Sequence, residues 1–125
     1  MNRISKLSVS LMCADLVNLE RDIHILEENG VDYLHVDIMD GMFVPSISFG
    51  MPVVESIRPC TDMIFDVHMM VVDPERYIEA VRKSGADIIS IHVEACKNII
   101  DTLLKIRETG AKPAIAINPE TPMET

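Results

Sequence analysis

The sequence predicts an α/β fold in which short strands alternate with amphipathic helices and the strands form a parallel sheet. Apolar residues alternate with period two in five short segments, and each of the first four is followed by apolar residues at helical spacing. Three similar joints close a helix and open a strand: Gly30-Val-Asp-Tyr33, Gly85-Ala-Asp-Ile88 and Gly110-Ala-Lys-Pro113. Repeated short connections of this kind imply parallel strands. An open doubly wound sheet of five strands and part of an eightfold βα barrel both fit.

Five segments have the pattern of strands. In the second, Leu34, Val36 and Ile38 alternate with more polar residues, so the two sets face opposite sides of the sheet. The fourth is apolar at most positions, as in a strand that is covered on both faces. The predicted strands cover residues 7–12, 33–39, 63–69, 87–93 and 112–117.

Four helices are predicted from apolar spacing and from residues that begin or end helices. Asp15 is the expected N-cap of the first helix, and Gly30 is its expected C′ residue. The triplet Asp73-Pro74-Glu75 combines a cap, a proline at the first position and an acid in the first turn. The expected helices lie between residues 15 and 30, at 50–58 with Pro52 in the first turn and Pro59 after it, between 73 and 85, and at 97–109.

The composition favours one domain in the cytoplasm. A chain of 125 residues that is 48% hydrophobic can bury a core, and it has no apolar run of ~18 residues and no secretory signal. A net charge of −9 argues against nucleic acid as a partner, and without an apolar run of ~18 residues no membrane span is expected. A phosphate ligand stays compatible, because helix N-termini hold phosphate through backbone N–H groups. The three cysteines have no metal or disulfide spacing and are expected to be reduced thiols.

Polar residues recur at the C-terminal ends of all five predicted strands. A lone histidine there is more often a hydrogen-bonded core residue, and a lone aspartate is more often a helix cap. Five successive strands that end this way favour a shared pocket, because ligands of parallel α/β folds lie at that end. The residues concerned are Ser10, His35, Asp37, His68, His92, Glu94 and Asn118.

Two imidazoles and one carboxylate within this group predict a site for a divalent metal. His35 and Asp37 share one face of a strand, and His68 supplies a third ligand from the next strand. This set suits Zn, Fe, Mn or Co and leaves positions for a substrate. Met39 and Met70 lie one step further along the same faces, either as core filling or as an apolar cover of the metal site.

Such a site suits epimerisation next to a carbonyl group. A metal that chelates a carbonyl and the adjacent hydroxyl stabilises an enediolate, and Asp37 can remove the proton between them. A second acid/base on the opposite face would complete the inversion. The chain offers no clear second carboxylate at the same depth, since Asp66 is expected to point deeper and Glu94 is a weaker candidate.

Several ordered motifs resemble the ribulose-phosphate 3-epimerase family from about Ile4 to Thr125. They are Ser8-Val-Ser-Leu-Met-Cys-Ala-Asp15, His35-Val-Asp-Ile-Met-Asp-Gly-Met-Phe-Val-Pro45, Asp66-Val-His-Met-Met70, Gly85-Ala-Asp87, His92-Val-Glu-Ala95 and Asn118-Pro-Glu-Thr-Pro122. The resemblance implies a (β/α)8 TIM barrel, with five strands and four helices in this chain. It also implies interconversion of ribulose 5-phosphate and xylulose 5-phosphate, or of allulose 6-phosphate and fructose 6-phosphate in close relatives.

The resemblance also assigns roles to particular residues. It implies that His35, Asp37 and His68 bind the metal and that Asp37 is the catalytic acid/base on one face. Substrate contacts fall on Ser10, His68, Met39 and Met70. The sequence departs from the family pattern at Val9, Met42 and Met69, where the family more often has Pro, His and Leu.

The family's fourth ligand and second acid/base come from strand seven, and its phosphate loops follow strands six to eight. We therefore expect residues 1–125 to be the N-terminal part of a single barrel domain. The capping-box pattern of Thr121-Pro-Met-Glu124 supports this expectation, because it predicts the start of another helix. The alternatives are a truncated half-barrel that binds metal or self-associates, and an independent flavodoxin-like binding module. A homo-oligomer is expected, with a phosphorylated ketose as substrate.

Overall fold

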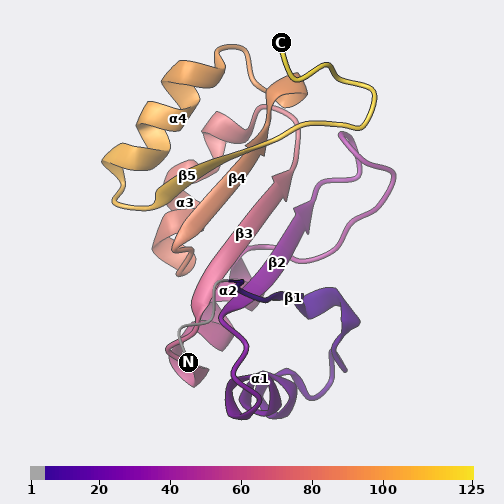
Figure 1. The fold of residues 1–125 in the computed structure, drawn as a ribbon, viewed down its shortest axis with the longest axis vertical. Coiled ribbons are helices and arrows are strands. Elements are labelled where there is room, and N and C mark those ends of the chain that lie inside the picture. Colours follow the sequence, from indigo (N-terminus) through magenta and orange to yellow (C-terminus); the bar gives the residue numbers. More distant parts are fainter. Residues whose placement is uncertain (1–4) are drawn as a thin grey trace.

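A computed structural model describes residues 5–125, which form a five-stranded parallel sheet with the strands in chain order, β1-β2-β3-β4-β5 (Figure 1). A doubly wound sheet of the flavodoxin type would place β1 inside the sheet. Sequential parallel strands joined by helices are instead the winding of a (β/α)8 barrel, so the predicted fold class is confirmed. The strands are β1 (Ser8–Ser10), β2 (Tyr33–Met39), β3 (Ile64–Met70), β4 (Ile88–His92) and β5 (Lys112–Ala116).

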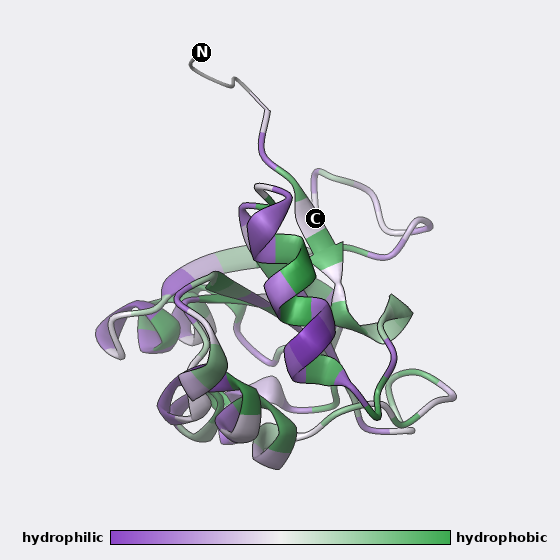
Figure 2. Ribbon diagram, turned by 90° about the horizontal axis from the view of Figure 1, so that it is seen from below, coloured by the Kyte–Doolittle hydropathy of each residue, from purple (hydrophilic) through white to green (hydrophobic). Residues whose placement is uncertain are grey.

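Four α-helices and four short 3₁₀ helices connect the strands. Figure 2 shows hydrophobic and hydrophilic residues interleaved along the helices, as expected for helices with one buried face. No helix between residues 5 and 125 combines the length and the apolar character that a membrane crossing needs. The elements are α1 (Leu19–Glu28), α2 (Met51–Ile57), α3 (Ile78–Ser84), α4 (Ile99–Glu108), η1 (Leu11–Cys13), η2 (Arg58–Cys60), η3 (Pro74–Arg76) and η4 (Val93–Ala95).

Alternate residues of each central strand face a dry core and a half-exposed surface. Leu34, Val36, Phe65 and Val67 are fully buried within one apolar cluster that also includes side chains of the helices. The residues between them along β2 and β3 are all of intermediate burial. This period-two pattern confirms the predicted alternation and assigns the polar residues to the second face.

The ends of the helices largely follow the predicted glycines. Gly30 has a φ of 72°, and its N–H donates to the carbonyl oxygen of Glu27 at 3.0 Å. The N–H of Val31 donates to Leu26 at 3.1 Å, which completes a Schellman motif. Gly85 and Gly110 also have positive φ values where α3 and α4 end.

Two predicted boundaries at the start of the chain are wrong. The first strand ends at Ser10, whose hydroxyl accepts the N–H of Met12 at 3.3 Å and turns the chain into η1. Asp15 is not the N-cap of α1, because its carboxylate accepts hydrogen bonds from the N–H of Val17 and the side-chain amide of Asn18. That local turn delays the helix, and Asn18 occupies the N-cap position instead.

Three further predictions need correction. Asp73 adopts the left-handed conformation without a side-chain cap and begins only η3, so α3 starts at Ile78. The fourth strand ends at His92 rather than at residue 93, and Glu94 lies in η4. Thr121 begins no helix among the described residues, because its hydroxyl donates to Glu94 at 2.5 Å instead of capping a turn.

Candidate functional site

The register of β2 against β3 aligns the predicted site residues in rows. His35 is paired with Asp66, Asp37 with His68 and Met39 with Met70. All six lie on the half-exposed face of the sheet. Two polar rows, which hold all three candidate metal ligands, are therefore followed along the strands by a row of two methionines.

His35, Asp37 and His68 form the cluster that the sequence predicts, and we call these three residues the metal cluster. Nε2 of His35 lies 3.0 Å from Oδ1 of Asp37, and Nδ1 of His68 lies 3.1 Å from the same oxygen. One possible ligand atom from each residue lies within 4.8 Å of the others. Such spacings suit atoms that share one ion at the usual bond lengths of about 2.0–2.2 Å.

Asp66 holds the far side of the His35 ring. Nδ1 of His35 lies 2.9 Å from Oδ2 of Asp66, which also accepts the hydroxyl of Ser8 at 3.0 Å. The hydrogen bond to Asp66 raises the pKa of His35 against the opposing effect of burial, and it lowers the pKa of Asp66. Both ring nitrogens of His35 thus face carboxylates, while a neutral imidazole has only one N–H. Either a second proton or a bound cation satisfies this geometry.

His68 has a different environment from that of His35. Its burial lowers its pKa, and the neighbouring His92 lowers it further. Nε2 of His68 lies 2.8 Å from Nε2 of His92, and the two rings stack with their centroids 5.0 Å apart. Burial thus favours the neutral imidazole, which is the form that binds metals.

His92 and Glu94 continue the polar chain away from the metal cluster. Nδ1 of His92 lies 3.3 Å from Oε2 of Glu94. Oε1 of Glu94 accepts the N–H of Asn118 at 2.6 Å and the hydroxyl of Thr121 at 2.5 Å. Burial alone would raise the pKa of Glu94, but these hydrogen bonds together outweigh it and lower the pKa to about 2. Glu94 is therefore an ionised anchor for its neighbours.

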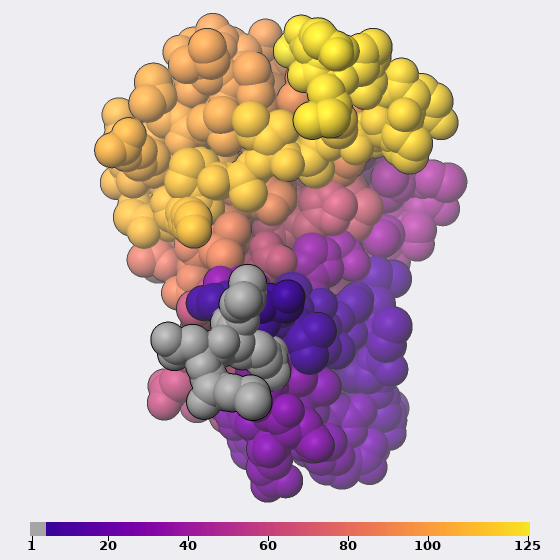
Figure 3. All heavy atoms as spheres, in the orientation of Figure 1, coloured from indigo at the N-terminus to yellow at the C-terminus, as the bar shows by residue number. Residues whose placement is uncertain are grey.

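Ser10, Met39 and Met70 lie where the sequence places them, and their roles in substrate binding stay predictions. Ser10 is paired with His35 across β1 and β2. The C-terminal segment and the loop after β2 lie at the same end of the molecule (Figure 3). Sequence reasoning missed Phe43 in that loop, whose ring centroid lies 5.0 Å from that of His92. The period of a strand gives no signal for a loop residue that folds back.

A second residue that sequence reasoning missed is Asp40, which shapes the loop after β2. Its carboxylate accepts the N–H groups of Met42 and Phe43, each at 2.8 Å, and that of Val72 at 2.7 Å. These bonds lower its pKa against the raising effect of burial. The Asp-Gly pair signals a turn, but the bond to Val72 depends on the packing of two loops.

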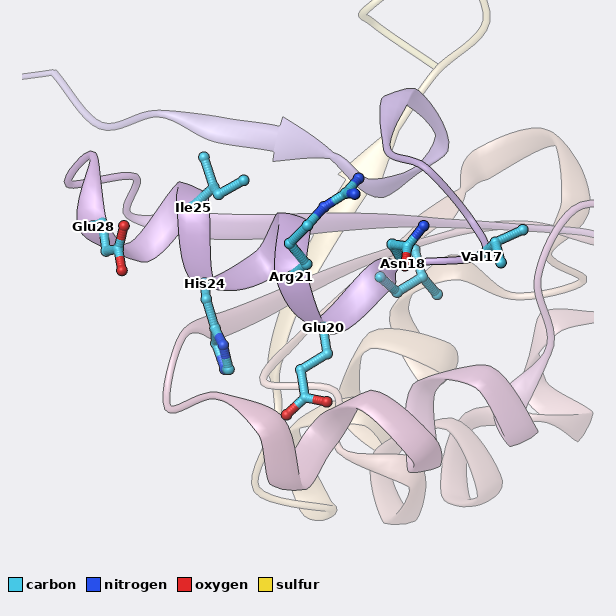
Figure 4. Close-up of a pocket in the computed structure, with 8 residues that line it drawn as sticks. Val17, Asn18, Glu20, Arg21, His24, Ile25 and Glu28 are labelled. Carbon is cyan, nitrogen blue, oxygen red and sulfur yellow. The ribbon is translucent and has the colours of Figure 1, made fainter.

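One open hollow in the described part of the chain lies away from the metal cluster. It runs along α1, where Glu20 and Arg21 point in opposite directions (Figure 4). His24 is turned away to the carbonyl oxygen of Cys60, with its Nε2 at 2.9 Å. Because its polar groups do not converge, we assign no site to this hollow.

Comparison with solved structures supports the fold. 7,8-Dihydropteroate synthase from Vibrio fischeri ES114 superposes with a TM-score of 0.65 at 16% identity, over 97% of this chain and 48% of that one. The Yersinia pestis DHPS gives a TM-score of 0.63 at 15% identity, over 93% of this chain and 45% of that one. At such low identity these similarities concern the fold alone.

Comparison with curated proteins identifies the family. Ribulose-phosphate 3-epimerase of Bacillus subtilis strain 168 is 44% identical over 95% of this chain and 55% of its own length. The enzyme of the same name from Synechocystis is 47% identical over 92% of this chain and 51% of its own length. The chain thus spans about half the length of these relatives. The sequence model of the ribulose-phosphate 3 epimerase family matches residues 6–125. The chain therefore belongs to the ribulose-phosphate 3-epimerase family.

Proposed function

We propose that a complete barrel containing this chain catalyses the metal-dependent 3-epimerisation of a ketose phosphate, with Asp37 as the acid/base on one face. The observation that best supports this proposal is the metal cluster, on the middle residues of β2 and β3, in a chain of this family. The preferred substrate pair is D-ribulose 5-phosphate and D-xylulose 5-phosphate, because the curated relatives compared above carry that enzyme name.

The side chains of the metal cluster fit a divalent cation such as Zn, Fe, Mn or Co. Two imidazole nitrogens converge on one carboxylate oxygen, at 3.0 and 3.1 Å. The carboxylate of Asp66 on the other nitrogen of His35 is the outer partner that metal-bound histidines usually have. When bound, the cation would act as a Lewis acid for the substrate carbonyl and the adjacent hydroxyl.

By this proposal, Asp37 carries out proton transfer at C3 of the sugar. Its carboxylate would take the C3 proton from one face, and the electron pair left behind would delocalise into the carbonyl as an enediolate. A second acid would return a proton to the opposite face and so invert C3. Met39 and Met70, two residues beyond Asp37 and His68 and on the same face, would keep water from the planar intermediate.

The second acid/base and the phosphate-binding groups belong, by this proposal, to further βα units of the barrel. The edges of β1 and β5 have no further strand partner among the described residues, and Ile115 of β5 is 55% exposed. An unpaired edge with apolar residues suits pairing with additional strands. The alternative of a half-barrel that self-associates uses the same edges. A cytoplasmic location and a homo-oligomeric state stay predictions.

The proposal is tested by replacing Asp37 with asparagine in the intact protein. Exchange of the C3 hydrogen of ribulose 5-phosphate with solvent should fall by about 10²-fold or more, because general acid–base catalysis commonly contributes 10²–10⁴-fold. Asp62→Asn makes the same chemical change at an exposed position before β3 and is the matched control. Allulose 6-phosphate should be tested in parallel as the alternative substrate. Unchanged exchange in Asp37→Asn would end the proposal.

A further inference from the structure

His92 lies directly behind His68, and this contact constrains the protons on both rings. Their Nε2 atoms are 2.8 Å apart, which is a hydrogen-bond distance. Only one proton fits between two nitrogens at this distance, so one ring donates and the other accepts. The contact alone leaves the direction open, because each neutral imidazole can carry its proton on either nitrogen.

Glu94 favours donation from His68 to His92. Its Oε2 faces Nδ1 of His92 at 3.3 Å, while its Oε1 accepts the backbone N–H of Asn118 and the hydroxyl of Thr121. An ionised carboxylate only accepts hydrogen bonds, so the proton of a neutral His92 lies on Nδ1. Nε2 of His92 then offers a lone pair to a proton on Nε2 of His68. In the metal-free protein the carboxylate of Asp37, 3.1 Å from Nδ1 of His68, competes for that proton, because it too only accepts hydrogen bonds. A cation shared by Asp37 and Nδ1 of His68 would remove this competition.

The consequence appears at the metal cluster. With its proton on Nε2, a neutral His68 has a bare lone pair on Nδ1, which faces Oδ1 of Asp37 at 3.1 Å. We propose that Glu94 and His92 are positioning residues that hold His68 in the tautomer whose Nδ1 lone pair is available to a cation shared with Asp37. This inference rests on the metal site of the proposed function and assigns the outer partners of its second histidine.

The surroundings of His92 make this arrangement rigid. His92 is 6% exposed, and the ring of Phe43 packs against it with the centroids 5.0 Å apart. The thiol of Cys96 donates to the carbonyl oxygen of His92 at 3.2 Å. Water therefore has little access to either side of the ring. His35 has its carboxylate partner in direct contact, whereas His68 reaches Glu94 through His92.

Replacing Glu94 with glutamine should reverse the donors and acceptors in the hydrogen bonds that join Glu94, His92 and His68, with a side chain of nearly the same shape. The backbone N–H of Asn118 can only donate, so the amide oxygen of the new side chain must stay on that side. The amide nitrogen then faces Nδ1 of His92 and donates to it. His92 would move its proton to Nε2, and His68 would have to carry its proton on Nδ1. A purely structural role of Glu94 predicts no such reversal.

The experiment uses the intact protein with ¹⁵N-labelled histidine. Long-range ¹H–¹⁵N spectra of the Zn²⁺-loaded protein should show the Nδ1–H tautomer of His92 in wild type and the Nε2–H tautomer in Glu94→Gln. Chelator competition with Zn²⁺ should show an affinity loss of about 10–100-fold in Glu94→Gln, the usual effect of removing an outer partner of a metal ligand. Thr121→Val is the matched control, because it removes a bond to Oε1 and keeps the contact with His92.

The inference is overturned if Zn²⁺-loaded wild type shows the Nε2–H tautomer of His92, a result that needs no folded variant. It is also overturned if Glu94→Gln leaves both the tautomer and the Zn²⁺ affinity of wild type. Normal C3 exchange in Asp37→Asn would instead overturn the proposed reaction while leaving the tautomer result intact. The two failures are therefore distinguishable.

Discussion

Replacing Arg58 with alanine is expected to destabilise the N-terminal end of the sheet without affecting the metal cluster. The guanidinium donates to the carbonyl oxygens of Gly85, Thr61 and Met63 at 2.7–3.1 Å. It also bonds to Oδ2 of Asp87 at 3.0 Å. Its carbon atom lies 3.7 Å from the centroid of the Phe65 ring. One side chain thus ties together the segments that lead into β3 and β4.

The structure gives the size of this effect. The three carbonyl oxygens lose charged donors at a site where the Arg58 side chain is only 26% exposed, and each loss costs about 1 kcal/mol once water partly replaces it. The cation–π contact adds about 0.5–1 kcal/mol. The ion pair with Asp87, which is 41% exposed, adds about 0.5 kcal/mol after solvent screening. The expected loss in free energy of unfolding is therefore about 4 kcal/mol.

Thermal unfolding of the intact protein measures the loss. For a domain of barrel size, about 4 kcal/mol corresponds to a fall in Tm of about 8–16 °C. Arg58→Lys is the matched control, because it keeps the charge but not the planar fork, and its Tm should lie between those of wild type and Arg58→Ala. A loss below about 1 kcal/mol in Arg58→Ala would refute the reasoning, since the carbonyl oxygens would then not depend on the guanidinium.

Four further predictions concern the metal cluster, its partner Asp66 and the glycines. Asp66→Asn should weaken Zn²⁺ binding by about 10–100-fold, whereas Ser8→Ala, which removes only a hydroxyl from the same carboxylate, should not; equal losses would contradict this. Zn²⁺ affinity should rise as pH rises through the raised pKa of His35, because a proton competes for Nε2; a flat profile above pH ~6.5 would contradict this. Over the same pH window, the free energy of unfolding of the metal-free protein should fall as pH rises. The pKa of His35 is raised in the folded state, so its stabilising contribution is complete below the unfolded pKa and is lost as the ring loses its proton. In urea unfolding, Gly85→Ala should destabilise the protein more than Gly30→Ala. A Cβ at residue 85 would lie 2.4 Å from Cδ of Arg58, whereas a Cβ at residue 30 would meet open space.

The periodic features of the fold were predictable from sequence because they depend on residues close together in the chain. The alternation of Leu34, Val36 and Ile38 fixed both the strand and its buried face. The failures at Asp15 and Asp73 have one physical cause. A short carboxylate can cap a helix or form a local turn, and the choice depends on backbone angles that the sequence pattern does not specify.

The metal cluster was predictable for a related reason, but its outer partners were not. Parallel pairing without a bulge places His68 beside Asp37, as the period of the two strands suggests. The partner of His35 could not be chosen in the same way, because Asp66 was expected to point deeper and its contact depends on rotamers. The contact of Glu94 with Asn118 and Thr121 required the turn after β5, whose path no period encodes.

These contacts form one network of hydrogen bonds that runs across the strands of the sheet. Asp66 connects Ser8 to His35, the metal cluster follows, and His92 and Glu94 carry the chain on to the turn after β5. Both histidines of the cluster therefore end on carboxylates that are themselves hydrogen-bonded. The hydrogen-bond partners of both rings come from residues of this chain. We infer that further βα units of a complete barrel would add ligands and phosphate contacts to a histidine pair that is already oriented.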